Sequence, residues 1–386
     1  MRNLNIKSLV VMGVMLTAQC ALAQLTMKDG IASIEDPILL GDGRFEDYAT
    51  EVAPVPRELL KRTPTQKEEK LIGKLEGLLK STRAKAFAMV DGGKVVWTGY
   101  QDAYLMHERF VSMSVSKSIL SVATGVAICK DKLSFDTKAV DLVPELKDKD
   151  LGQALIKHLL TMTSGTWEGN SDSSILSQEQ RMLLMTGSMN LLQVLTTDLV
   201  SSGVQGFFSP KRKPGDVFAY RSTDPLLLAI MLERATGLPY GKFLADEILI
   251  PAGISQPAFS GRDMSGFPRA DGVLRMKLDD WIRVAIWIKE QSTAETCLGS
   301  YLRDATQQKV ANRVKSNYPQ RLKGYGYFFG LDNEYAPDTY WAVGFAGQEI
   351  GWSRNSQKIV LGFANSDLHI KEFEKIYGEW LVDNSH

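Results

Sequence analysis

The chain contains the stretch Phe110-Val-Ser-Met-Ser114-Val-Ser-Lys117-Ser-Ile-Leu120, from which both a fold and a chemistry can be predicted. Ser114 and Lys117 are three residues apart, so a helix would place both side chains on one face, one turn apart. The lysine amine could then reach the serine hydroxyl and act as the base that a serine nucleophile needs. No other Ser-x-x-Lys sequence occurs in the chain. The alternative is that Ser114 only caps a core helix and that Lys117 is solvated.

The residues after Ser114 predict one buried helix. Apolar residues recur at helical spacing from Val115 to Val126, with small residues between them, until Lys130 ends the pattern. A serine in the first turn of such a helix lies beside free backbone N–H groups, and the helix dipole favours negative charge there. Because this environment suits a hydroxyl that becomes an alkoxide, we predict Ser114 as the nucleophile.

The start of the chain predicts a cleavable export signal. Arg2 and Lys7 give it a positive start, residues 8–22 are largely apolar, and small residues around Ala23 form a cleavage site. The apolar run is too short for a good membrane span, so no stable membrane insertion is expected. We therefore expect an exported protein, periplasmic or secreted, after cleavage near Ala23. The alternative is a lipoprotein anchored through Cys20, although the residue before that cysteine is not small.

Composition argues against several other classes of protein. The chain of 386 residues has 45 basic and 45 acidic residues and no basic block, which gives no reason to expect a nucleic-acid partner. Its four histidines lack metal-ligand spacing, and neither a Gly-x-Ser-x-Gly elbow nor a phosphate-binding glycine loop occurs. We therefore expect no metal and no organic cofactor. The sequence leaves open whether Cys129 and Cys297 form a disulfide.

Local patterns predict strands and helices at both ends of the chain, with helices between them. Two apolar runs around Asp91-Gly92-Gly93 predict a hairpin. The other predicted elements are a helix at 66–83, strands at 325–330, 340–343, 349–353 and 359–365, and a closing helix at 368–383.

This order of elements predicts an α+β protein. We expect residues 66–130 and 250–386 to form one discontinuous α/β domain, and residues 131–249 to form a mainly helical domain that interrupts it. Residues 24–65 contain several prolines and are expected to wrap around the body as an N-terminal extension.

A second reactive group is predicted after Pro214-Gly215, where Tyr220 and Ser222 stand two residues apart. On extended backbone such residues point the same way. A phenol close to the lysine could relay a proton to a leaving group. The alternative is that Tyr220 is only a half-buried aromatic residue.

The segment Gly344-Phe-Ala-Gly347-Gln348 lies between two predicted strands. Its glycines suit a strand edge that lies close to another group, such as a substrate backbone. The Gln348 N–H could then point at an oxyanion. The alternative is an ordinary hairpin bend.

Together these residues resemble the class C β-lactamase-related serine hydrolases. The matching stretches run in order over residues 85–365, and they are Ser114-x-x-Lys117, Gly125 to Asp136, His158 to Gly165, Tyr220-Arg-Ser222 and Leu232 to Ile254. Two patterns are most similar to the 6-aminohexanoate-dimer (nylon oligomer) hydrolase branch, namely Phe218-x-Tyr220-x-Ser222-x-Asp224 and Gly344-x-x-Gly347-Gln348.

The resemblance implies a β-lactamase and penicillin-binding-protein fold, in which the active site lies between an antiparallel sheet flanked by helices and an all-α domain. It implies that Ser114 is acylated, that Lys117 and Tyr220 transfer protons, and that the N–H groups of Ser114 and Gln348 hold the oxyanion. The residues expected to contact substrate are Ser222, Phe345, Ala346, Gly347, Trp167 and Trp341.

The chain departs from the penicillin-recognising members of this family at two positions. It has Ser222 where they carry asparagine, and Phe345 where the wider family carries lysine or histidine. A phenyl ring cannot pair with a substrate carboxylate, so we expect an exported hydrolase of a small amide or ester rather than a penicillinase. The alternatives are a β-lactamase or D-Ala-D-Ala carboxypeptidase, and a non-catalytic module that binds β-lactams or peptidoglycan.

Overall fold

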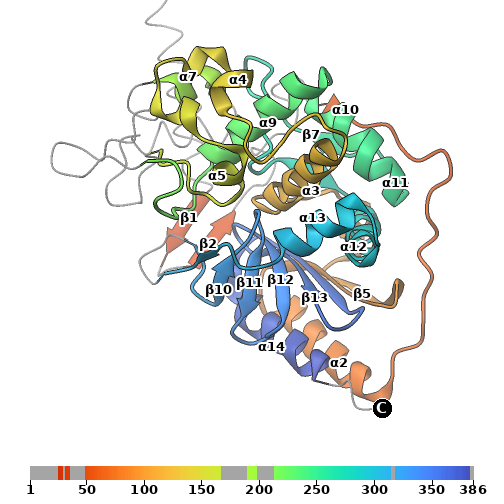
Figure 1. Ribbon diagram of the computed structural model, residues 1–386. Helices are drawn as coiled ribbons and strands as arrows, with labels where there is room; N and C mark the ends of the chain where they lie inside the picture. The colour runs from red at the N-terminus through yellow and green to blue at the C-terminus, as the bar shows by residue number, and fades with distance from the viewer. Residues whose placement is uncertain are drawn as a thin grey trace, which may run out of the picture.

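The computed structural model describes residues 48–166, 189–197, 213–313 and 318–382, together with the backbone of two short strands, β1 (Leu25–Lys28) and β2 (Ile31–Ile34). A large antiparallel sheet forms the centre of this part of the chain (Figure 1), with the strand order β5-β4-β14-β13-β12-β11-β10-β9. Its strands are β4 (Ala84–Asp91), β5 (Lys94–Tyr100), β9 (Val310–Ala311), β10 (Leu322–Tyr325), β11 (Gly330–Asn333), β12 (Thr339–Gly344), β13 (Gln348–Ser353) and β14 (Ile359–Ala364).

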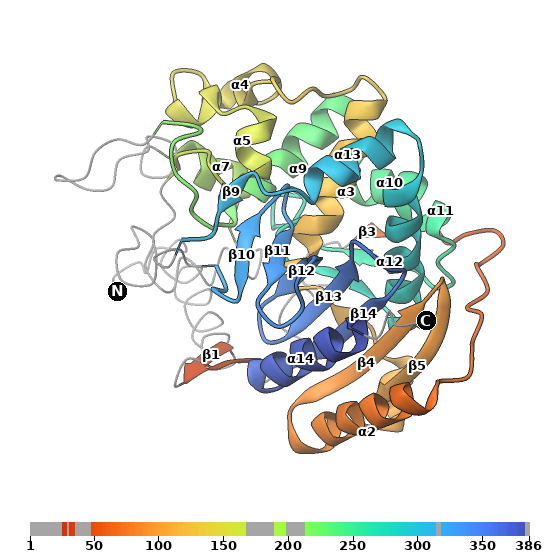
Figure 2. The same cartoon turned by 60° about the horizontal axis from the view of Figure 1, so that its bottom comes forward.

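Helices cover both faces of this sheet. On one face lie α2 (Gln66–Ser81) and α14 (Ile370–Leu381), which Figure 2 shows in front of the strands. Here Trp341 of the sheet packs edge-on against Tyr377, with ring centroids 5.5 Å apart. The other face is covered by α3 (Val115–Cys129), α12 (Leu278–Thr293) and α13 (Cys297–Ala305), and here the indole N–H of Trp352 donates to the Ala285 carbonyl of α12. The predicted α+β class is therefore confirmed.

The described parts of residues 131–249 contain helices and turns and no named strand. The main helix is α9 (Thr223–Thr236), and shorter ones surround it, namely α4 (Ala139–Leu142), α5 (Ile156–Leu160), α7 (Leu191–Thr196) and α10 (Tyr240–Leu244). One hydrophobic core runs without a break from these helices into the sheet. The proposed domain boundaries therefore remain a prediction.

A small second sheet brings three distant parts of the chain together. Its strand order is β3 (Tyr48–Ala49), β7 (Phe259–Ser260), β8 (Leu274–Met276) and β6 (Phe110–Val111). From β3 the chain continues along the outside of the molecule, and the Thr50 N–H donates to the Ala258 carbonyl. Further on it reaches β5, where Arg62 donates to Val95. Figure 1 shows this segment as an orange path down one side of the molecule.

Local sequence patterns predicted most elements of the large sheet correctly. The β4–β5 hairpin turns at Gly92 and Gly93, whose φ angles of 57° and 73° fit the mirror-image turn that suits twisted strands. The strand predicted at 325–330 is wrong, because that stretch spans the turn from β10 to β11. Phe328 has a φ of 58°, and its N–H donates to the Leu160 carbonyl instead of to a neighbouring strand.

A disulfide joins Cys129 at the end of α3 to Cys297 at the start of α13, with Cα atoms 5.8 Å apart. The two cysteines are 168 residues apart in sequence, so the bond closes a long loop. Such a bond restricts the unfolded chain, which favours the folded state by about 3 to 5 kcal/mol.

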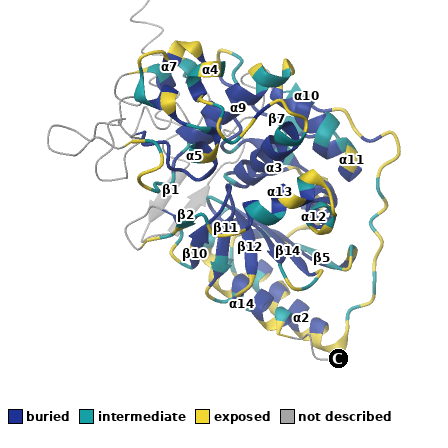
Figure 3. Cartoon of the chain, viewed as in Figure 1, coloured by how far each residue is buried: buried dark blue, intermediate teal, exposed yellow. Residues whose placement is uncertain are grey.

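The helix that follows Ser114 is buried along most of its length. Residues from Val115 to Ala127 are all buried, and Figure 3 shows α3 in dark blue between the sheet and the outer helices. Among the described residues, no helix is both long and apolar enough to cross a membrane.

Candidate active site

Ser114 is the N-cap residue of α3, where the chain leaves β6 and turns into the helix. It is only partly buried, whereas Ser112, Ser116 and Ser118 in the same run are at most 1% exposed. The hydroxyls of Ser112 and Ser116 bond to each other, 2.5 Å apart, and both accept from the Leu274 N–H. Ser114 is therefore the serine of this run that a substrate can reach.

Lys117 points back at Ser114 along the same face of the helix. Its Nζ donates to the Ser114 hydroxyl oxygen at 2.7 Å and to the Asp271 carbonyl at 2.8 Å. The residue is only 2% exposed, so the alternative that Lys117 is solvated is wrong. Both bonds hold the amine in place beside the hydroxyl, as a base in proton transfer requires.

The residue that accepts from Lys117 belongs to a buried ion pair. Arg269 donates to the Asp271 carboxylate at 3.0 Å, and the two side chains are 3% and 6% exposed. Burial raises the pKa of the Asp271 carboxyl, but the charges of Arg269 and Lys117 outweigh this effect, so the pKa lies below its usual value. The chain around Asp271 is 154 residues from Lys117 and carries no motif, so the sequence gave no signal for this contact.

Tyr220 lies next to Lys117, whose Nζ is 5.2 Å from the centroid of the tyrosine ring. The ring also packs on Tyr318 at 4.8 Å and edge-on against Tyr325 at 6.2 Å. Burial raises the pKa of both neighbouring phenols well above the usual value, so they stay neutral. The structure thus brings Ser114, Lys117 and Tyr220 together, and Ser222 follows as the N-cap residue of α9.

A buried polar network holds the backbone around Tyr220. Asp224 is fully buried and accepts from the Ser164 hydroxyl at 2.5 Å. Arg221 donates to the side chains of Ser164 and Thr166 at 3.3 and 2.7 Å. Because these bonds link the start of α9 to the loop after α5, they fix where the Tyr220 ring can lie.

The end of β12 lies directly against the nucleophile. A Cβ atom added to Gly344 would stand 2.7 Å from the Ser112 carbonyl oxygen and 3.0 Å from the Ser114 nitrogen. Only glycine allows this approach. The side chain of Phe345, the next residue, is half-buried and packs against Val111 and Met113.

The predicted role of the Gln348 N–H group as an oxyanion donor stays a prediction. Gln348 begins β13 and pairs across the ladder with Gly344. Gly344 is the residue of this hairpin that lies against the Ser114 nitrogen. The N–H of the Gly344–Phe345 peptide is therefore a second candidate donor.

The remaining predicted substrate contacts have different surroundings. Ala346 and Gly347 are buried in the turn, and a Cβ on Gly347 would stand 2.4 Å from the His369 ring. Trp341 is fully buried on the α14 face of the sheet, opposite to the face that α3 covers, so its position does not support a substrate contact. Trp167 lies outside the described residues.

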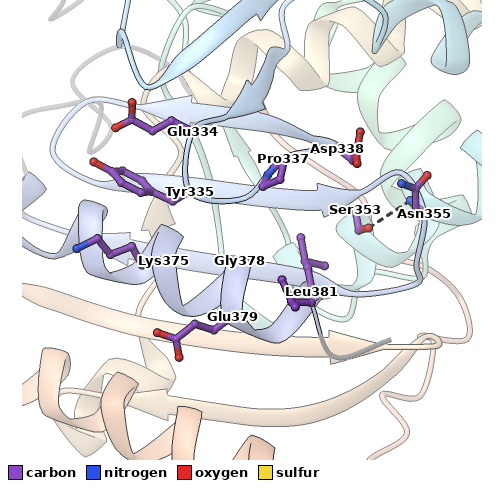
Figure 4. Close-up of a pocket in the computed structure, with 11 residues that line it drawn as sticks. Glu334, Tyr335, Pro337, Asp338, Ser353, Asn355, Lys375, Gly378, Glu379 and Leu381 are labelled. Atoms are coloured by element: carbon purple, nitrogen blue, oxygen red, sulfur yellow. Dashed lines mark hydrogen bonds between the residues drawn. The ribbon is translucent and has the colours of Figure 1, made fainter. Parts of the chain in front are cut away.

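A separate groove of about 610 Å³ lies beside α14, between the β11–β12 loop and the β13–β14 turn (Figure 4). It contains none of the predicted site residues. Three of its charged side chains form ion pairs, namely Glu334 with Lys323, Lys375 with Glu372 and Glu379 with Lys74. It therefore offers no chemistry comparable to that around Ser114. Within the described residues, no group of histidine, cysteine, aspartate or glutamate side chains could hold a metal ion.

His369 lies against the turn between β12 and β13, and its burial predicts a change of stability at acid pH. Its ring is fully buried between Phe87 and Phe373, and burial lowers its pKa from 6.5 to about 4. The unfolded state therefore takes up the proton first, so stability is lost as pH falls from 6.5 to 4. The expected loss is roughly 3 kcal/mol.

The measurement is urea unfolding at several pH values for the wild type and for His369→Gln, which does not titrate in this range. The difference between the two free energies of unfolding should change over this interval and be constant above pH 7. A difference that does not depend on pH would contradict the assignment.

With this geometry in place, the chain can be compared with known proteins. A family model described as Beta-lactamase matches residues 74–379, which is more than half of the chain. The chain therefore belongs to the β-lactamase family. This confirms the fold and the class of serine hydrolase that the resemblance in sequence predicts.

Two curated proteins are similar in sequence. The 6-aminohexanoate-dimer hydrolase of Paenarthrobacter ureafaciens is 25% identical over 274 residues, which cover 67% of this chain and 66% of that protein. Penicillin-binding protein 4* of Bacillus subtilis (strain 168) is 26% identical over 164 residues, which cover 40% of this chain and 32% of that protein. The chain thus spans about a third of one relative and just under two thirds of the other.

A solved structure is similar over most of its length. It is that of a Bacillus anthracis protein provisionally described as a 6-aminohexanoate-dimer hydrolase. The TM-score is 0.68 at 15% identity, and the match covers 88% of this chain and 90% of that one. At this identity the likeness concerns the fold alone. It agrees with the predicted β-lactamase and penicillin-binding-protein architecture.

Proposed function

We propose that this protein cleaves a small amide or ester through an acyl-enzyme on Ser114. The observation that carries the proposal is the 2.7 Å contact between Lys117 Nζ and the hydroxyl of the one accessible serine in the run. The hydroxyl oxygen attacks the substrate carbonyl carbon, and Lys117, as the free amine, accepts the hydroxyl proton. Tyr220 then gives its phenol proton to the departing amine or alcohol and takes the proton that Lys117 holds, so that both groups return to their starting state.

Water completes the reaction by attacking the acyl-enzyme ester. The same groups act in reverse, so that Ser114 regains its proton as the acid product leaves. Backbone N–H groups hold the negative oxygen in both steps. We assign this role to the N–H of Ser114 and to that of the Gly344–Phe345 peptide, because Gly344 lies against the Ser114 nitrogen.

Phe345 supports the choice of a neutral substrate. Its ring packs on Val111 and Met113 beside the nucleophile and offers no charge to a substrate carboxylate. Leaving such a carboxylate unpaired in a buried site costs several kcal/mol. An uncharged acyl group avoids this cost, and the similarity to a 6-aminohexanoate-dimer hydrolase supports a linear amide as one candidate.

A panel of substrates tests this proposal. We expect short p-nitrophenyl esters and an uncharged linear amide dimer to be hydrolysed with a higher kcat/KM than nitrocefin or benzylpenicillin. Phe345→Lys should shift the ratio of kcat/KM towards the substrates that carry a carboxylate. If the wild type hydrolyses benzylpenicillin as fast as its best neutral ester, the β-lactamase alternative is the better one. If no substrate is turned over and no acyl-enzyme accumulates, the non-catalytic alternative holds.

We also propose that the protein is exported, because its start resembles a signal peptide and because disulfides persist mainly in oxidising compartments. The protein purified from its host should begin at Gln24. Digestion without reductant should yield a peptide that contains both Cys129 and Cys297. Free thiols at both positions would contradict export, and a lipid-modified Cys20 as first residue would indicate an anchored lipoprotein.

A further inference from the structure

The side chain of Gln348 makes more hydrogen bonds than any predicted role of this residue requires. Its amide nitrogen donates to the carbonyls of Phe345, Ala346 and Ala364 at 3.0, 2.9 and 2.8 Å. Its amide oxygen accepts from the Ala364 N–H at 3.2 Å. The residue is 3% exposed. One buried amide therefore joins the turn after β12 to the neighbouring strand β14.

The turn needs such support, because its backbone is not in a relaxed conformation. Ala346 has a φ of 57° and Gly347 a φ of 85°, both in the left-handed region. For a residue with a Cβ atom this conformation costs about 1 kcal/mol or more, and it persists where surrounding contacts enforce it. Gln348 supplies contacts of this kind, since it bonds to the Phe345 and Ala346 carbonyls, which lie before and after the Ala346 Cα atom.

The other end of the same turn lies at the reaction centre. Gly344 is close against Ser112 and Ser114, and the Phe345 ring packs on Met113. The chain from Gly344 to Ala346 thus lies against the nucleophile at its start and is bonded to the Gln348 amide at its end. A shift of the turn would move this peptide relative to Ser114.

We propose that Gln348 is a positioning residue, whose side chain sets the place of the second oxyanion donor through the Phe345 and Ala346 carbonyls. This inference rests on the proposed function of Ser114 as a nucleophile. An amide is required because its two N–H donors serve the three carbonyls and its oxygen accepts from one N–H. Glutamate would place carboxylate oxygens against those carbonyls, and leucine would leave the carbonyls without a donor.

The test compares p-nitrophenyl acetate with its thionocarbonyl analogue. An oxyanion site stabilises a negative oxygen better than a larger negative sulfur, so the ratio of the two kcat values reports how well the donors are placed. Gln348→Glu and Gln348→Leu should lower kcat for the oxygen ester by tenfold or more, with KM within about twofold of wild type, since the loss of one oxyanion donor costs about 10² to 10³. The oxygen-to-sulfur ratio should fall in both variants.

Asn333→Leu is the matched control. Asn333 is a buried amide of the same sheet, 1% exposed, that accepts from the Tyr335 N–H and so braces a different turn. This variant should lose thermal stability and keep the wild-type ratio. Active-site titration with a fluorophosphonate, taken to its end point, corrects each kcat for the fraction of folded enzyme.

Two results would overturn the inference in different ways. If both Gln348 variants keep the wild-type ratio while their melting temperatures fall, Gln348 has a structural role only. If the wild type neither hydrolyses the ester nor is labelled at Ser114, the proposed function fails, and the positioning role fails with it.

Discussion

Replacing Ser114 by alanine is expected to reduce hydrolysis by about 10⁴-fold or more, as removal of a catalytic serine does in other hydrolases. The reason is that the hydroxyl bonded to Lys117 is the group that forms the acyl-enzyme. The change removes one partly exposed hydroxyl oxygen. Although Ser114 is the N-cap residue of α3, its side chain makes no capping hydrogen bond, so the melting temperature should stay within a few degrees of wild type. Steady-state kinetics and thermal melts measure both effects.

Ser116→Ala separates this expectation from a general sensitivity of the helix. The Ser116 hydroxyl is buried, bonds to Ser112 and accepts from the Leu274 N–H, so its loss should cost about 1 to 3 kcal/mol of stability. Its kcat should remain close to that of wild type. A fluorophosphonate should label Ser114 in both the wild type and this control. Labelling at Ser112 or Ser116 would contradict the assignment of the nucleophile.

The parts of the fold that the sequence predicted are those set by local patterns. The apolar period after Ser114 predicted α3, and the Gly92-Gly93 pair predicted the first hairpin. The stretch 325–330 is rich in aromatic residues, which are typical of strands, so its composition predicts a strand. In the structure those residues form a buried turn whose N–H and C=O groups bond to α5 and α3.

The parts of the site that the sequence missed depend on contacts between distant residues. The serine and lysine could be paired because one helix turn fixes their spacing. The Asp271 carbonyl lies in the segment between β7 and β8, and no local pattern predicts that this segment contacts Lys117. Trp341 was misplaced because alternation along a strand decides which face a side chain takes, and the sequence does not say which face meets α3.

Lys117→Met and Tyr220→Phe should each lower kcat by about 10² or more, the usual effect of losing a positioned acid–base group. The methionine keeps most of the volume of Lys117 but leaves the Ser114 hydroxyl without its base. The phenylalanine keeps the ring that packs on Tyr318 and removes only the hydroxyl. Because both residues serve one proton path, the double variant should be little slower than the slower single one.

Stability and chemistry can be told apart in these variants. Lys117→Met also leaves the buried Asp271 carbonyl without its lysine donor, so its melting temperature should fall, whereas that of Tyr220→Phe should not. Tyr301→Phe is the matched control, since it removes a buried phenol that bonds to Ser121 farther along α3, and its kcat should be close to wild type. Losses below tenfold that add in the double variant would mean that Lys117 and Tyr220 only pack beside Ser114. Losses that do not add would mean that a single proton path connects the serine hydroxyl to the leaving group.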